Sequence, residues 1–270
     1  MNATDIQNAL AAKGIDAVEV ETVKNGIVCK GYQIDNGTNV KPVIYYSSDE
    51  TVEAFADRAV RIANLPVPDF DTENLISKER LLKDTIICLQ KQGSEQIVKR
   101  DYLNLEQYVR LNVDFGDSDN RGSIKVTDQV LKQAGLSEDE LFEAAKSNSM
   151  NKISICSMAE VLGLTDAPDD IPFYVGTYDD RCHGAGILAM PEVINEFCRD
   201  KGFDKVCIIP SSTEEILILS ADTVENPAEL ANMVKDVNET TVDPTLQLET
   251  CVYGFNIKTQ KVSIVSSCVE

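Results

Sequence analysis

The segment AVEVETVKNGIVCKGYQI, residues 17–34, is the stretch that determines the expected fold class. Its two halves, 17–24 and 27–34, are rich in β-branched residues and flank Asn25-Gly26, a pair of turn residues that tolerates positive φ. This combination predicts two antiparallel strands joined by a two-residue turn. Such hairpins argue against a doubly wound fold, in which helices connect parallel strands.

Two further hairpins are expected in the second half of the chain. The apolar runs KVCIIP, at 205–210, and EILIL, at 215–219, lie on either side of a short polar loop, and 251–257 with 261–265 repeat the arrangement. Helical patterns are interspersed among these strands. We therefore expect an α+β protein with antiparallel sheets and interspersed helices, packed as two lobes.

Changes of pattern along the chain divide it into three expected parts. Residues 1–66 predict a helix, a β-meander and a second helix, and the proline-rich stretch LPVP at 65–68 marks a linker, since proline disfavours helix in the residue before it. A middle α+β segment, 67–150, follows. The remaining part, 151–270, is expected to form an acidic α+β lobe.

Local signals predict where several helices begin and where one further strand lies. Residues that can cap a helix N-terminus precede the helical patterns: Thr4, Ser47 with Glu50, Thr127, and Ser137 with Glu140. The apolar run GAGILAM, from Gly184, predicts a strand.

The charge of the chain is strongly negative and unevenly distributed. The formal net charge is −20; Met1 to Gly135 holds 21 acidic against 16 basic residues, and Leu136 to Glu270 holds 24 against 9. Such a surface repels nucleic acid and anionic membranes and attracts basic protein surfaces. We therefore expect a basic protein partner, no direct nucleic-acid binding and no membrane association. The same charge also fits a well-solvated protein with no such partner.

The cysteines and the N-terminus indicate a reducing compartment. None of the eight cysteines forms a C-x-x-C pair, and several lie in apolar runs, where free cysteine behaves as a small hydrophobe. The opening MNATDIQNALAAKG lacks the pattern of a signal peptide, and no apolar run approaches the length of a membrane span. A cytoplasmic location is expected.

The loop IIPSSTEE contains the most unusual polar cluster of the sequence. Ser211, Ser212, Glu214 and Glu215 lie between two predicted strands, so their hydroxyls and carboxylates could bind a polar ligand or act as nucleophile and base. The alternative is a hairpin loop whose hydroxyls cap backbone groups, because no base with a tuned pKa can be identified.

A second polar loop contains the single histidine of the chain. Asp179 and Asp180 are candidate binding residues, and His183 follows Cys182 as a candidate ligand or nucleophile, although a polar turn between strands explains the same residues. One histidine excludes multi-histidine metal sites, and the glycine-rich nucleotide-binding motifs are absent. No catalytic residue, metal or cofactor is expected.

The stretch DSDNRGSIKVTD, 117–128, imitates the start of an EF-hand loop. Arg121 and Lys125 occupy ligand positions, where their charge would repel Ca²⁺, and Asp128 is shorter than the expected glutamate. A hairpin turn is the preferred interpretation.

Several motifs resemble, in order, an uncharacterised clostridial family, domain-of-unknown-function family 5688. They are TVKNGIVCKGYQI, VKPVIYY, VKRDYLNLEQYVRL, GLSEDELFEAAKSNS, PFYVGTY with GAGIL, VCIIPSSTEEILIL and MVKDVNETTV. Members of this family usually carry a Thr-Asn pair after the YV strand and a histidine two residues after PSS. Here those places read Gly176-Thr177-Tyr178 and Thr213-Glu214. The resemblance implies a bacterial or mobile-element source and no established activity.

Two functions from different classes follow as hypotheses. The first is a non-catalytic interaction protein whose acidic second half binds a basic protein surface, as a nucleic-acid-mimicking decoy or phage-related inhibitor. The second is an enzyme or small-ligand binder that uses the PSSTEE loop, with its polar groups converging on a pocket. A purely structural or cation-binding role for the acidic loops is the third alternative.

Overall fold

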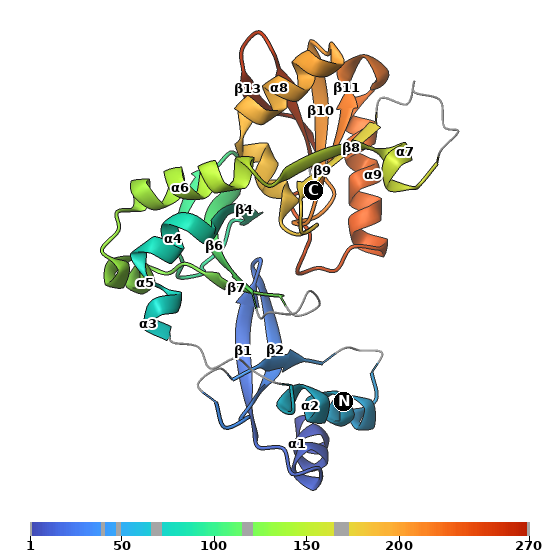
Figure 1. The fold of residues 1–270 in the computed structure, drawn as a ribbon. Coiled ribbons are helices and arrows are strands. Elements are labelled where there is room, and N and C mark those ends of the chain that lie inside the picture. The colour runs from blue at the N-terminus through green and yellow to red at the C-terminus, as the bar shows by residue number, and fades with distance from the viewer. Residues whose placement is uncertain are drawn as a thin grey trace. The chain divides into compact units, whose positions relative to one another are not determined.

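A computed structural model describes residues 2–38, 41–46, 50–65, 72–114, 121–164 and 173–268. The chain divides into two compact units, which are described separately (Figure 1). Unit 1 comprises Met1–Leu75 with Asp114–Arg121, and unit 2 comprises Ile76–Val113 with Gly122–Glu270. The described residues form helices and three antiparallel sheets, which confirms the α+β class. None of their helices combines the length and apolar character that crossing a bilayer requires.

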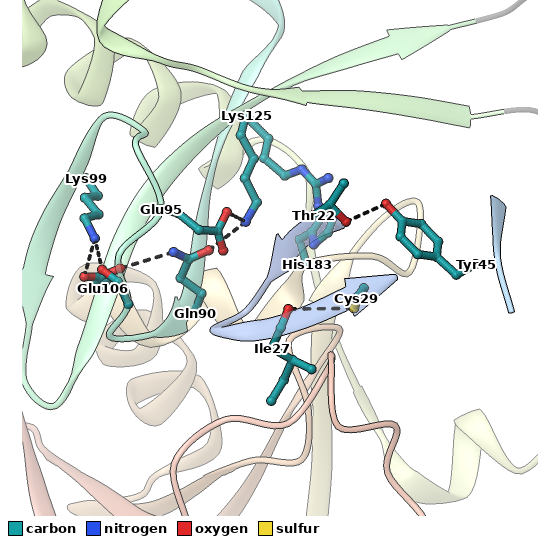
Figure 2. A network of polar contacts seen from close by, with 12 residues as sticks. Thr22, Ile27, Cys29, Tyr45, Gln90, Glu95, Lys99, Glu106, Lys125 and His183 are labelled. Atoms are coloured by element: carbon teal, nitrogen blue, oxygen red, sulfur yellow. Dashed lines mark hydrogen bonds and ion pairs between the residues drawn. The ribbon is translucent and has the colours of Figure 1, made fainter. Parts of the chain in front are cut away.

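Unit 1 is a three-stranded sheet with helices. Its elements are α1 (Ala3–Ala12), β1 (Ala17–Lys24), β2 (Ile27–Ile34), β3 (Val43–Tyr45), α2 (Val52–Ala63) and α3 (Thr72–Leu75). The predicted hairpin is confirmed, because β1 and β2 pair from Ala17↔Ile34 to Lys24↔Ile27. Strand β3 pairs with β2, and Tyr45 Oη lies 2.9 Å from Thr22 Oγ1 of β1 (Figure 2).

The core of unit 1 lies between its sheet and helices α1 and α2. Phe55 is fully buried there, with its ring edge-on to Tyr32 at 5.7 Å and to Tyr46 at 5.9 Å between centroids. Helix α2 is capped by Thr51, whose side chain accepts from the Ala54 N–H. The predicted cap Ser47 lies outside the described residues.

Unit 2 begins with a four-stranded sheet and helices. Its elements are α4 (Lys78–Asp84), β4 (Thr85–Lys91), β5 (Lys99–Tyr102), β6 (Leu105–Asp114), β7 (Arg121–Lys125), α5 (Asp128–Ala134) and α6 (Glu138–Met150). The strand order is β4-β6-β5, and β7 also pairs with β6. Thr127 caps α5, and Ser137 and Glu140 form the predicted capping box of α6. Residues 117–120 of the EF-hand-like stretch lie outside the described part.

A six-stranded antiparallel sheet forms the rest of unit 2. Its elements are β8 (Ile153–Ser157), α7 (Met158–Val161), β9 (Phe173–Tyr178), η1 (Gly184–Ala189), α8 (Pro191–Lys201), β10 (Lys205–Pro210), β11 (Ile216–Ser220), η2 (Ala221–Thr223), α9 (Pro227–Thr240), β12 (Cys251–Asn256) and β13 (Lys261–Ser267). The strand order is β13-β12-β10-β11-β9-β8. Both predicted hairpins, β10 with β11 and β12 with β13, are confirmed.

Helices α8 and α9 cover opposite faces of this sheet. Tyr174 of β9 packs edge-on against Phe197 of α8, with ring centroids 5.0 Å apart. Ile218 of β11 pairs with Tyr174 on one side and with Ile208 of β10 on the other, so all three side chains lie on the same face of the sheet. Cys207 points to the other face, since successive strand residues alternate, and there it clusters with Ala231 of α9. The sheet is therefore enclosed by one helix on each side (Figure 1).

The strand predicted for GAGILAM is wrong, because Gly184–Ala189 form the short 3₁₀ helix η1. All six residues are buried, and an apolar run buried on every side shows no periodicity that separates strand from helix. Tyr178 donates to the Ile87 carbonyl oxygen at 2.8 Å, and Tyr102 donates to the Leu188 carbonyl oxygen at 2.6 Å. Segment η1 thus lies where the two sheets of unit 2 meet.

Replacing Ser137 with alanine is expected to lower the free energy of unfolding by about 1 kcal/mol, because the Glu140 N–H loses its capping partner and the hydroxyl no longer donates to the Glu140 carboxylate. The Ser137 hydroxyl accepts from the Glu140 N–H at 3.3 Å, and Glu140 Oε2 accepts from the Ser137 N–H at 2.9 Å. Urea unfolding measures the loss. The control is Ser263→Ala on exposed β13, and equal midpoints for the two variants would contradict the prediction.

Candidate functional site

Two loops that are distant in the sequence meet at one end of the six-stranded sheet. Loop 179–183 follows β9, and loop 211–215 connects β10 to β11. Because Gly176 of β9 pairs with Ile216 of β11, both loops lie at the same end of the sheet. The Glu214 carbonyl oxygen accepts from the Gly184 N–H at 2.8 Å and from the Thr177 hydroxyl at 3.0 Å. The fold therefore brings together the two polar clusters selected from the sequence.

Hydrogen bonds within loop 211–215 satisfy most of its side chains. Ser211 donates to Glu215 Oε1 at 2.9 Å, Ser212 Oγ accepts from the Glu214 N–H at 3.0 Å, and Thr213 donates to Glu214 Oε1 at 2.9 Å. This is the arrangement expected of a hairpin loop whose hydroxyls hold its own backbone and carboxylates. A binding role for Ser211, Ser212 and Glu215 stays a prediction.

The acidic residues of loop 179–183 have different surroundings. Asp180 accepts from the Cys182 N–H at 3.1 Å, whereas the Asp179 side chain is exposed and its backbone N–H donates to the Lys152 carbonyl oxygen. These two aspartates also stay predicted binding residues.

His183 is held in place from both sides. Its backbone is left-handed, with a φ of 59°, and its N–H donates to Glu214 Oε2 at 3.3 Å. The ring Nε2 lies 2.9 Å from Arg110 Nη1, and Nδ1 lies 3.6 Å from Glu214 Oε1. A guanidinium can only donate, so Nε2 accepts and the neutral ring carries its proton on Nδ1, facing the carboxylate.

The surroundings of His183 keep its imidazole uncharged. Burial lowers the pKa of His183 to about 3, with further lowering by the charges of Arg110 and Lys125. Protonation would place an N–H on Nε2 against a guanidinium, with no lone pair left to accept its hydrogen bond. The ring is therefore neutral at physiological pH and is not a general base poised near pH 7.

Arg110 of β6 is a half-buried cation with no carboxylate partner among the described residues. It pairs across the strands with Ile86. Within the described part, the only hydrogen bond of its side chain is to His183, and its buried Nε has no hydrogen-bond partner. Arg58 of unit 1, by contrast, binds Glu50 through two nitrogens, at 2.9 and 2.6 Å. A guanidinium normally binds a planar acceptor such as a carboxylate in this way. Arg110 therefore has N–H groups that no described residue accepts.

A chain of charged and amide groups continues from Lys125 across the four-stranded sheet (Figure 2). Lys125 forms an ion pair with Glu95 and donates to Gln90 Oε1 at 2.9 Å. Gln90 donates to Glu106 Oε2 at 3.2 Å, and Glu106 accepts from Lys99 at 2.7 Å. Burial lowers the pKa of Lys125, and the bond to Glu95 opposes that effect. Lys125 adds a second positive charge near His183.

Two side chains of this cluster with nucleophilic potential, Cys88 and Tyr108, are protonated at neutral pH. Cys88 is fully buried and its burial raises the pKa of its thiol to about 12, while burial also raises the pKa of Tyr108. The thiolate, not the thiol, is the reactive form of cysteine. Among the described residues, no group of three or more His, Cys, Asp or Glu side chains could hold a metal ion.

Sequence reasoning missed the part of this cluster that lies on β6. Leu105, Val109, Leu111 and Val113 share one buried face of that strand, and no residue of its other face was among the predicted site residues. Glu106, Tyr108 and Arg110 occupy that opposite face. Polar residues alternating with a buried run are the signal that could have found the site.

The acidic residues of the second half do not gather on one side of the six-stranded sheet. Exposed Glu196 and Asp200 lie on α8, and exposed Glu229 and Asp236 lie on α9, which covers the opposite face. This distribution does not favour a single acidic face, and a basic protein partner stays a prediction.

Fold and site together define an α+β protein with a half-buried arginine–histidine–glutamate cluster at the junction of two antiparallel sheets. Residues 4–256 match the family of unknown function DUF5688, so the chain belongs to that family. The resemblance seen in the sequence motifs is thereby confirmed. No curated protein and no solved structure matches the chain.

Proposed function

We propose that this chain is a non-catalytic binding protein that takes up a small ligand bearing a carboxylate or phosphate group. The observation that carries the proposal is the half-buried Arg110, which has no carboxylate within ion-pair distance among the described residues, in a chain with 45 acidic residues. Arg110 would hold the anionic group through the terminal N–H groups that His183 does not accept.

The neighbours of Arg110 support an anion in two ways. Lys125 contributes positive charge, although it is paired with Glu95. The neutral His183 accepts a hydrogen bond from Nη1 of Arg110 and thereby orients the guanidinium, while the other N–H groups remain available. Nε2 stays the acceptor because the Arg110 guanidinium can only donate, and the Nδ1 proton faces Glu214 at 3.6 Å, beyond hydrogen-bond distance. In this scheme the PSSTEE loop positions the cation instead of contacting the ligand.

The pKa values at the cluster favour binding over catalysis. A histidine with a pKa of about 3 and a thiol with a pKa of about 12 are both in their uncharged forms at neutral pH. General acid–base catalysis works best with a pKa near the working pH.

Calorimetric titration with inorganic phosphate, acetate and succinate tests the proposal. We expect at least one of these probes to bind, and Arg110→Gln to weaken that binding at least about tenfold, because a hydrogen bond to a charged group is lost. Arg199→Gln, on the exposed side of α8, is the matched control and should leave binding unchanged. Equal affinity in Arg110→Gln, or no binding of any probe at millimolar concentration, would refute the proposal.

A further inference from the structure

An open groove of about 540 Å³ lies on the α9 side of the six-stranded sheet, away from the arginine cluster. We name it the α9 groove; its lining is Lys205, Val206, Cys207, Ala221, Val224, Pro227, Gly254, Phe255, Asn256, Thr259, Lys261, Ser263 and Val265. It sits at the Lys205 end of β10, whereas loop 211–215 follows the other end, roughly 20 Å along the strand. A volume in this range is typical of small-molecule sites.

The charge of the α9 groove is opposite to that of the chain. None of the lining residues is acidic, although the second half of the sequence has 24 acidic residues. Two of the lining residues are lysines. Lys205 and Lys261 flank Asn256 on one rung of the sheet, so both side chains stand on the same face. Both are exposed, and neither has a carboxylate within ion-pair distance among the described residues.

The remainder of the lining is largely apolar and partly open to solvent. Val265 of β13 is 47 % exposed, Val224 and Pro227 are half-buried, and Cys207 is buried beneath them. A side chain at Gly254 would collide with Val265, whose Cγ2 would lie 2.5 Å from the added carbon. Because residue 254 has no side chain, Val265 packs directly over it against the sheet, and the groove is shallow at that point.

We propose that the α9 groove binds an amphipathic anion of the fatty-acid class. Its carboxylate would lie between Lys205 and Lys261, and its alkyl chain would cover the surface of Val265, Val224 and Pro227. Charge complementarity selects the headgroup, and burial of methylene groups supplies most of the affinity. This site is independent of the proposed anion site at Arg110.

Titration with octanoate and decanoate below their micelle-forming concentrations tests the assignment. We expect a site whose affinity rises about fourfold for each added methylene, which distinguishes it from carboxylate binding at Arg110, where the alkyl chain takes no part. The double variant Lys205→Gln/Lys261→Gln should bind decanoate about tenfold more weakly, because two exposed charge pairs are lost. Val265→Asp, which places a carboxylate in the groove at an exposed position, should weaken binding by at least as much.

Two controls test whether decanoate binds in the α9 groove and whether its charge matters there. Lys258→Gln, in the β12–β13 turn but outside the groove, should leave the chain-length-dependent binding unchanged. Decyltrimethylammonium, which has the same alkyl chain and the opposite charge, should bind at least tenfold more weakly than decanoate. Equal binding of the two amphiphiles, binding seen only with micelles, or unchanged decanoate affinity in the double lysine variant would overturn the proposal.

Discussion

Replacing Gly186 with alanine is expected to lower the free energy of unfolding by about 3 kcal/mol, because the added methyl group has no space. It would lie 2.4 Å from the Ile87 carbonyl oxygen and 2.4 Å from Tyr178 Oη. Those two atoms are joined by a 2.8 Å hydrogen bond that links β4 to β9. Relief of the clash therefore requires a shift of main chain or the loss of a buried bond.

The matched control separates collision from backbone strain. Gly135 has a left-handed φ of 64° at the end of α5, and nothing lies within 4 Å of a side chain added there. Gly135→Ala should cost only about 1–2 kcal/mol, the penalty of a left-handed residue with a β-carbon. Urea unfolding of both variants gives the comparison. A loss at Gly186 no greater than that at Gly135 would contradict tight packing of η1 between the sheets.

Acidification below pH 6.5 is expected to destabilise the protein through its single histidine. The unfolded chain binds a proton at His183 near pH 6.5, whereas the folded protein, with a pKa of about 3, does not. The unfolded state therefore holds more protons between these values, and stability falls as the pH is lowered. The slope from this residue approaches about 1.4 kcal/mol per pH unit.

Urea unfolding of the wild type and of His183→Gln between pH 7 and pH 5 isolates this contribution. Carboxylates with lowered pKa values, such as Glu106 and Glu140, stay ionised in that range and lose their stabilising effect only at lower pH. We expect the wild type to lose stability more steeply than the variant. Parallel curves would show that the histidine titrates alike in both states.

Nuclear magnetic resonance of the same imidazole gives a direct measurement. One histidine means one set of ring signals, and these should show the Nδ1–H tautomer with no titration between pH 8 and pH 5. Arg110→Gln should raise the pKa of His183, since a neighbouring positive charge is removed. An anion bound at Arg110 should act in the same direction. A wild-type midpoint between pH 6 and pH 7 would contradict the geometry of the cluster.

Local sequence signals predicted the elements that depend on neighbours in the chain. The Asn25-Gly26 turn, the Ser137–Glu140 capping box and the Thr127 cap all appear where the sequence placed them. Each depends on hydrogen bonds or backbone angles within a few residues. The cap expected at Thr4 is an exception, because Asn2 accepts from the Thr4 N–H and caps α1 instead.

The candidate site was predicted in part. Both polar loops were selected, and the contact of Glu214 with His183 joins them. Their cationic partners Arg110 and Lys125 come from β6 and β7, and no spacing in the sequence relates those strands to the loops.

Hairpin turns, helix caps, strand alternation and the excess of acidic residues could all be inferred from the chain alone, since each depends on residue type and short-range geometry. The helical state of η1, the neutral form of His183 and the cationic lining of the α9 groove could not. Each depends on which side chains a sheet brings together from distant segments, and burial among them changes both the backbone conformation and the charge state.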